Sequence, residues 1–213
     1  MSEPLTTRGR ETRERILLSA ARLFHAQGVA ATSVDEVLAA AGAGKGQLYR
    51  YFASKEELTA AVVDHQLVRY LGPQRERLEG LERWEDLEAY IDDLVAGHRE
   101  VGLVGGCPVG SLALEMAGRN ERLRRRLAEE LGGWRASLAT GLRRLVARDE
   151  LPAATPPEQL ALGLLASIQG AYLLSTVEGD VEAMRDALRA ALVALRAHPG
   201  AGGAISTPDP RRY

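Results

Sequence analysis

Apolar residues near the N-terminus recur at helical spacing and are interrupted by glycines. The first predicted helix covers residues from about 10 to 27, has an apolar inner stripe, and ends at Gly28. Residues 1–9 form a polar arm that contains Arg8. This arm either reaches a DNA groove or backbone, or is a frayed, solvated tail.

Two further helices are predicted between residues 33 and 52. Ser33 and Glu36 have the spacing of a capping box, and Gly42 supplies the left-handed residue that ends the first of these helices. The second spans residues 45–51, and two apolar side chains at its end point inward. Two helices joined by a tight, glycine-containing turn form the geometry that places the second helix in a DNA major groove.

The rest of the chain is also predicted to be helical, which makes the fold all-α. Aromatic residues are few and no segment shows sustained β-branched alternation. The further helices are expected at residues 55 to about 70, a short piece through 81, 84–101, 108–117, 121 to about 148, 156–177 and 180–198. We expect Gly72-Pro73 to break or kink the first of these, and Thr155 with Glu158 to form a T-x-x-E cap.

Three regions follow from this pattern. Residues 1–55 are expected to be a DNA-binding helix-turn-helix domain, and residues 56–198 a ligand-binding and dimerisation domain. Residues 199–213 lack any apolar period and are expected to be disordered. The formal net charge is −2, but residues 1–55 carry eight Lys and Arg against five Asp and Glu, a net +3, which leaves −5 for the remainder. A basic head on an acidic body suits a protein that binds nucleic acid with one end.

The second helix of the predicted motif carries side chains suited to DNA. The polar and aromatic residues of this helix can donate hydrogen bonds. These residues are Lys45, Gln47, Tyr49, Arg50 and Tyr51. Glutamine can bridge the N6 and N7 edge of adenine, and Lys or Arg can reach guanine or phosphate. Gly46 lacks a side chain where the backbone must approach another surface. The competing interpretation is a solvated face on a small helical domain.

Residues 10–58 resemble the N-terminal domain of the TetR family of bacterial transcriptional repressors. The matching stretches are RERILLSAARLFHAQGVAATSVDEVLAAAG, GKGQLYRYF and SKEEL. The resemblance implies a homodimeric, all-helical repressor with a ligand pocket in its C-terminal domain. Carried over by position, the DNA contacts would be Thr32, Lys45, Gln47, Tyr49, Tyr51 and Lys55. Gly44 departs from the family, which often has Ser there, so a hydroxyl contact to phosphate is lost. The stretch GCPVGSLALEM also resembles a segment in the branch with lincomycin-resistance repressors.

The predicted pocket is drawn from polar or aromatic residues within otherwise apolar helices. These residues are His65, Tyr90, His98, Cys107, Met116, Trp134, Gln169 and Tyr172. Each could instead be an ordinary core or exposed residue. Gln169 is the hardest to explain as core, because an unpaired buried amide is costly. A small apolar or aromatic molecule is the expected ligand.

Cys107 precedes Pro108, which fits the first position of a helix, so the cysteine is placed at the helix N-cap. A thiol there would meet amide donors and the positive end of the helix dipole, which would lower its pKa and suit an oxidant or electrophile sensor. The alternative is a small apolar residue packed under a loop. Both interpretations stay open from the sequence.

Several classes of function find no support in the sequence. There is no G-x-S-x-G, P-loop or strand-linked G-x-G-x-x-G motif, and the four His and one Cys show no metal-ligand spacing, so we expect no enzyme, no metal and no cofactor. No signal peptide, internal disulfide or run of 18 apolar residues is present, which indicates a cytoplasmic protein with no membrane partner. Helix 156–177 is apolar on more than one face, so a partner chain is expected to cover it, together with helix 180–198.

The sequence therefore predicts a ligand-responsive, DNA-binding transcriptional repressor. A dimer would hold a palindromic operator in double-stranded DNA and be released from it by a small-molecule inducer. The alternative mechanism is a thiol-based redox or electrophile sensor that acts through Cys107.

Overall fold

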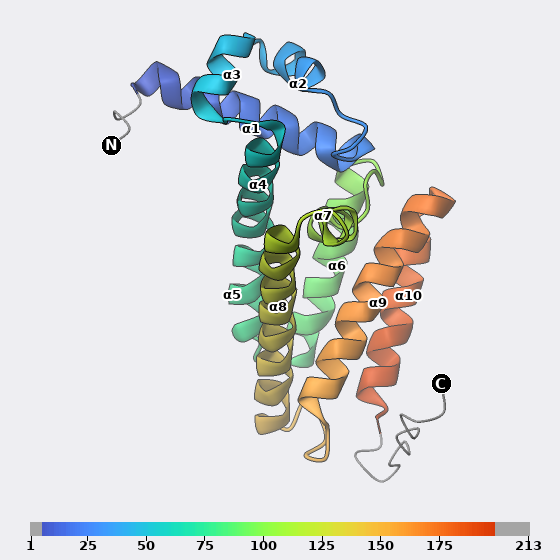
Figure 1. Cartoon of the computed structure of the whole chain (residues 1–213). Helices are drawn as coiled ribbons and strands as arrows, with labels where there is room; N and C mark the ends of the chain where they lie inside the picture. The colour runs from blue at the N-terminus through green and yellow to red at the C-terminus, as the bar shows by residue number, and fades with distance from the viewer. Residues whose placement is uncertain (1–5, 199–213) are drawn as a thin grey trace, which may run out of the picture.

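The computed structural model describes residues 6–198, and within this range the chain is all-α, with no strand (Figure 1). A π-helical segment (Leu67–Leu71) joins two of the α-helices. The α-helices are α1 (Thr7–Gln27), α2 (Val34–Ala41), α3 (Lys45–Tyr51), α4 (Lys55–Gln66), α5 (Gly72–Glu79), α6 (Trp84–Glu100), α7 (Pro108–Ala117), α8 (Glu121–Ala147), α9 (Pro157–Glu178) and α10 (Val181–Arg196). We call described residues up to 55 the head and residues 56–198 the body.

The head is built on α1, which lies across the upper ends of the body helices (Figure 1). This helix begins at Thr7, earlier than predicted, because the Thr6 hydroxyl accepts a hydrogen bond from the Gly9 N–H and caps it. Arg8 is therefore part of α1, which contradicts its placement on a polar arm. Residues 1–5 of that predicted arm lie outside the described residues, as does the tail predicted over residues 199–213.

The helix-turn-helix forms where the sequence predicted it. Ser33 and Glu36 cap α2 reciprocally, and Gly42 ends α2 with a left-handed φ of 59°. Leu48 is buried beneath α3, and Phe52 is buried at its end with the Arg13 guanidinium 5.0 Å from the ring centroid. Local capping and two apolar anchors thus fix the angle at which α3 leaves α2.

A break or a kink was predicted at Gly72-Pro73, and the break was wrong, because the chain stays helical from α4 into α5. The π-helical segment Leu67–Leu71 lies between them, and Pro73 falls in the first turn of α5. A proline lacks the N–H that an α-helix interior needs, and a π turn changes the hydrogen-bond register where that bond would be lost. The result is one long helical rod that leads from the head into the body.

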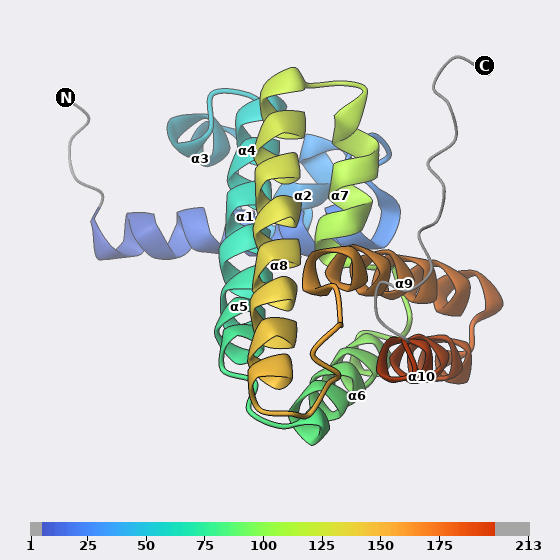
Figure 2. The same ribbon diagram turned by 90° about the horizontal axis from the view of Figure 1, so that it is seen from below.

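The core of the body lies between α5, α6, α8 and α9. Gly141 of α8 permits a close approach, because a Cβ there would lie 2.5 Å from the Leu78 carbonyl oxygen. Two views agree that α9 and α10 run side by side, and α9 also packs against α8 (Figures 1 and 2). The last two helices therefore form a lateral wing of the body.

Helix α9 differs from the prediction in two respects, its N-cap and the extent of its apolar sequence. Pro156 is its N-cap and makes no side-chain bond, so the predicted cap by Thr155 was wrong, and the Thr155 side chain is buried instead. Contrary to the sequence estimate, α9 is long and apolar enough to span a membrane by length and composition. One side of it is buried against α8 and α10, as in a core helix. On the other side several large apolar residues are exposed, namely Leu162, Leu173, Leu174 and Val177.

Candidate DNA-binding surface and ligand cavity

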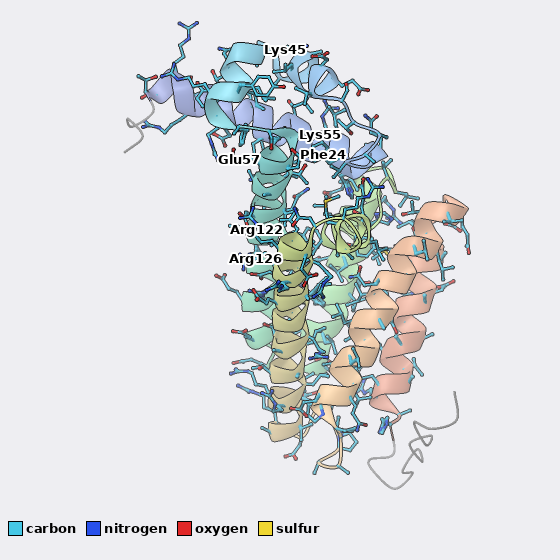
Figure 3. The ribbon with its side chains drawn as sticks, in the orientation of Figure 1. Phe24, Lys45, Lys55, Glu57, Arg122 and Arg126 are labelled. Atoms are coloured by element: carbon cyan, nitrogen blue, oxygen red, sulfur yellow. The ribbon has the colours of Figure 1, made fainter. Side chains whose placement is uncertain are left out.

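The outer face of α3 carries five exposed residues that the sequence analysis named as candidate DNA contacts. They are Lys45, Gly46, Gln47, Tyr49 and Arg50. The Lys45 side chain lies on the far side of the head from the body (Figure 3). A Cβ at Gly46 would meet no other atom within 4 Å, so the backbone there is open to a close partner.

Two of these side chains already make interactions within the head. The Gln47 Oε1 atom accepts a hydrogen bond from the Gly44 N–H at 2.9 Å, which closes the start of α3. Gln47 is exposed, and its amide NH₂ group still has two N–H donors. Lys45 Nζ lies 3.0 Å from Asp35 Oδ1, and both side chains are about two-thirds exposed. Because an exposed ion pair contributes little stability, a DNA phosphate can replace the Asp35 carboxylate at low cost.

Three further expected contacts lie differently. Tyr51 is half-buried at the end of α3, and Lys55 is half-buried at the first position of α4 (Figure 3). Thr32 is completely buried, and its hydroxyl donates a hydrogen bond to the Gly28 carbonyl at 2.7 Å. Its side chain is therefore closed to DNA, and the expectation of a direct hydroxyl contact does not fit the structure. Thr32 instead holds the turn that precedes α2.

The body contains a cavity of about 240 Å³ between α5, α6, α9 and the loop before α7. Of the residues predicted for a pocket, Tyr90, His98 and Tyr172 line it. The other lining residues are Tyr70, Pro73, Gln74, Arg77, Asp93, Leu94, Gly97, Val101, Gly106 and Pro108. Most of this wall is apolar or aromatic, as ligand pockets generally are.

The sequence analysis missed one wall of this cavity. Tyr70, Gln74 and Arg77 have the spacing of a single helical face, which would have indicated them if the helix had been expected to continue past Pro73. The π-helical segment Leu67–Leu71 carries Tyr70, and short π segments recur at functional sites.

Tyrosine hydroxyls form the polar part of the cavity. Trp134 Nε1–H donates to the Tyr90 hydroxyl at 3.0 Å, and that hydroxyl donates to Gln74 Oε1 at 2.8 Å. Tyr70 and Tyr172 share a hydrogen bond between their hydroxyls. Burial raises the pKa of all three tyrosines, so they stay protonated at neutral pH.

The charged groups of the lining are compensated. The Arg77 guanidinium and the Asp93 carboxylate form an ion pair with one another. Burial lowers the pKa of His98, with a smaller contribution from His25, so this imidazole is neutral at pH 7. The described lining therefore presents no net charge to a ligand.

The remaining residues predicted for the pocket lie outside the lining of this cavity. Trp134 is fully buried and reaches the cavity through two lining residues, with a hydrogen bond to Tyr90 and an edge-on ring contact with Tyr70. Met116 lines a separate crevice between head and body, and His65 lines none of the cavities described here. Gln169 Nε2 lies 3.6 Å from Cys107 Sγ, so these two residues satisfy each other behind the cavity wall. The expectation for His65, Met116 and Gln169 as lining residues does not fit this cavity.

Cys107 is the N-cap of α7, as predicted, and its sulfur accepts from the Gly110 N–H at 3.4 Å. Of the two interpretations left open by the sequence, the thiol with a lowered pKa does not fit the structure, and the small residue packed under a loop does. Burial raises the pKa of the thiol, and the backbone amides of Gly110 and Val109 oppose that only in part. A buried, protonated thiol is a poor nucleophile. Among the described residues no group of His, Cys, Asp and Glu is arranged to hold a metal ion.

An all-α body with a cavity, attached to a helix-turn-helix with an exposed polar second helix, defines a DNA-binding regulator. Comparison with known proteins gives the family. Residues 16–62 match the family model of bacterial regulatory proteins of the TetR family, and residues 80–191 match the tetracyclin repressor-like C-terminal domain. The chain belongs to the TetR family of transcriptional regulators, which are DNA-binding proteins and not enzymes.

Individual relatives agree with this assignment. An HTH-type transcriptional regulator from the lacX 3′ region of Lactococcus lactis is 31% identical over 183 residues, which cover 82% of this chain and 88% of the relative. The HTH-type transcriptional regulator LmrA of Bacillus subtilis is 27% identical over 169 residues, which cover 78% of this chain and 86% of LmrA. A TetR regulator of known structure from Chloroflexus aurantiacus is 28% identical, with a TM-score of 0.76, and the match covers 89% of this chain and 96% of that one.

Proposed function

We propose that the protein is a cytoplasmic, dimeric repressor that holds a palindromic operator and leaves it when a neutral, largely apolar aromatic molecule enters the body cavity. The observation that carries the proposal is the pairing of an exposed polar α3 with a separate, uncharged aromatic cavity in one chain. Proteins of this fold have been solved on operator DNA and with a small molecule bound.

The roles on DNA follow from the position of each side chain. Gln47 and Tyr49 lie on the exposed face of α3, where Gln47 can read a base edge and Tyr49 can pack against the backbone or a thymine methyl group. Lys45 and Lys55 lie at the starts of α3 and α4, where an ammonium suits a phosphate. They are the only lysines in the chain, and their place at two helix starts slightly favours this role over chance.

The cavity supports a ligand class but not a single compound. Its volume of about 240 Å³ exceeds the roughly 150 Å³ that accommodates benzene in an apolar protein cavity, so one or two aromatic rings fit. The wall offers tyrosine hydroxyls, and its Arg77–Asp93 pair already compensates itself, which disfavours a charged ligand. The alternative of a thiol sensor is less well supported, because Cys107 is buried and its pKa is raised.

The first experiment is to recover and sequence the DNA that the purified protein retains from its own genome, and to measure binding to a fluorescent duplex of that sequence. We expect a palindrome with half-sites about one helical turn apart. Lys55→Ala should weaken binding to all sequences alike and lower the salt slope by about one unit, whereas Gln47→Ala should relax one operator position by roughly 1–3 kcal/mol.

Arg148→Ala is the matched control, because it removes one positive charge at the far end of α8. This variant should bind like the unmutated protein. If Lys55→Ala and Gln47→Ala both keep full affinity and selectivity at matched salt, the assignment of α3 as the reading helix is refuted.

A further inference from the structure

A carboxylate from the body holds the turn between α1 and α2 in the head. Glu115 of α7 accepts a hydrogen bond from the Val29 N–H at 2.8 Å through Oε2 and from the Ala30 N–H at 2.6 Å through Oε1. Gly28 has a φ of 87°, and a Cβ there would lie 3.3 Å from Glu115 Oε2. The turn is therefore shaped around the carboxylate, which binds backbone donors about 85 residues earlier in the chain.

This turn sets the position of the helix-turn-helix. Immediately after it, the Thr32 hydroxyl is bonded to the Gly28 carbonyl and the Ser33 hydroxyl caps α2. Hydrogen bonds from N–H groups to a carboxylate are stronger than neutral ones, because the acceptor is charged. Fixing residues 28–30 thus fixes the start of α2 and, through Gly42, the direction of α3.

The same helix, α7, begins at the ligand cavity. Gly106 and Pro108 line the cavity, and α7 runs from Pro108 to Ala117. A helix of this length is rigid and about 15 Å long, at roughly 1.5 Å per residue. The preceding loop also touches the head, since a Cβ at Gly105 would lie 2.1 Å from the His25 carbonyl oxygen. A shift at the cavity wall therefore moves both places where this segment meets the head.

We propose that Glu115 is the positioning residue that transmits occupancy of the cavity to the DNA-reading head. The inference rests on the proposed function. It differs from transmission through α4, which joins head and body covalently, because Glu115 acts through two non-covalent bonds that a displacement of α7 can break. Glu115 bonds only backbone N–H groups of the turn. Its loss should therefore change the orientation of the head and leave the side chains that contact bases unchanged.

The test uses a substitution that fills the cavity in place of a ligand. Gly97 lines the cavity, and a Cβ there would meet no other atom within 4 Å, so the side chain added by Gly97→Leu can occupy part of the cavity, and Gly97→Ala serves as its small control. Glu115→Gln keeps the shape of the side chain but removes the charge and one of the two acceptors. Glu129→Gln on the exposed face of α8 is the matched control for charge.

Operator dissociation constants are measured for the parent, the single variants and the double variants. We expect Gly97→Leu to weaken operator binding at least tenfold when Glu115 is present and no more than about twofold in the Glu115→Gln background, which is the coupling that a double-mutant cycle isolates. The effect of Gly97→Leu should be unchanged in the Glu129→Gln background. An equal effect in all backgrounds, whether large or absent, overturns the proposal.

A second measurement needs no change at Glu115 and covers the case in which Glu115→Gln fails to fold. Amide hydrogen exchange is compared between the parent and Gly97→Leu. Faster exchange at residues 28–31, with exchange in α2 and α3 unchanged, supports the proposal, and unchanged exchange at residues 28–31 contradicts it. If the parent protein retains no operator DNA, the proposed function itself fails, and that result is visible before either comparison is made.

Discussion

His98 connects the cavity with α9 at the scale of a single residue. Its side chain is 2% exposed, its Nε2 lies 3.3 Å from Thr176 Oγ1, and its ring packs edge-on against Tyr172 with centroids 4.8 Å apart. Burial lowers the pKa of His98, and burial also lowers the pKa of His25, against a smaller opposing effect of the Val104 backbone. Both imidazoles are held neutral by the fold.

This burial makes stability depend on pH. Below a pH of about 6.5, His25 and His98 bind protons in the unfolded chain but stay neutral in the native state. Their contribution to the free energy of unfolding is therefore fully present above pH 6.5. It decreases as the pH falls toward the lowered pKa values of the native state. Each group contributes a slope of at most about 1.4 kcal/mol per pH unit.

His98→Phe keeps an aromatic ring beside Tyr172 and cannot take up a proton. Urea unfolding between pH 5 and pH 8 should show a shallower loss of stability for this variant than for the parent, while the contribution of His25 remains. Parallel profiles for the two proteins would show that His98 does not titrate between the two states.

Residue roles were predictable from sequence where they depend on local pattern. The exposure of Lys45, Gln47 and Tyr49 follows from helical spacing, with Leu48 as the opposite, buried face. Thr32 was misplaced, because its burial depends on how the turn folds back onto the Gly28 carbonyl.

Cys107 shows the limit of local reasoning most clearly. Its position as a helix N-cap follows from the neighbouring proline, but burial in the folded body raises its pKa, and the hydrogen bond from Gln169, 62 residues away, opposes that rise only in part. Long-range burial of this kind leaves no local signal in the sequence.

Most element boundaries carry a local signal as well. Ser33 caps its helix as predicted, and Asn120 and Asp180 act in the same way, because each side chain bonds an N–H within the next turn. The errors at Pro73 and Thr155 both involve prolines, whereas α1 begins earlier than predicted because the Thr6 side chain caps it. At Pro73 the helix continues, and at the start of α9 no side chain forms a cap. We attribute both to packing against other helices, which leaves no local signal.

The wing formed by α9 and α10 leaves an apolar surface exposed on a single chain. Leu173 is 62% and Val177 is 76% exposed on α9, and Val193 is 69% exposed on α10. Large apolar side chains exposed on neighbouring helices indicate an interface. A second copy of the chain, packed through the same surface, would cover them with two-fold symmetry and set the spacing of the two heads.

Leu173→Glu should give monomers, because burying a carboxylate in an apolar interface is costly. Operator affinity should fall at least tenfold, while the helical circular-dichroism spectrum is retained. Val68→Glu is the control, since Val68 is 74% exposed on the π-helical segment, away from the wing. Light scattering at micromolar concentration should give two chains for the parent and for Val68→Glu. A mass of one chain for the parent would contradict the interface.

The molecule as a whole divides its charge between its two ends. Residues 1–55 carry a net +3 and the remainder −5, so the head is attracted to DNA while the body is repelled by it. This asymmetry orients the protein before contact and leaves the cavity on the side away from the nucleic acid. In the proposed mechanism, ligand binding would only have to favour, by a few kcal/mol, a head arrangement that no longer matches one turn of DNA in order to change operator occupancy strongly.

The most direct test of the whole account is the release of operator DNA by a ligand in the presence and absence of the thiol. Fluorescence anisotropy of the recovered operator is followed for the parent and Cys107→Ser, with a panel of one- and two-ring aromatic compounds and separately with mild peroxide. In a Trp84→Phe background, the fluorescence of Trp134 reports binding at the cavity, because Trp134 is bonded to Tyr90. We expect both proteins to ignore peroxide, and both to leave the operator with the compound that quenches Trp134. Release of the parent by peroxide, with Cys107→Ser unaffected and no compound active, would contradict the ligand mechanism and favour the thiol.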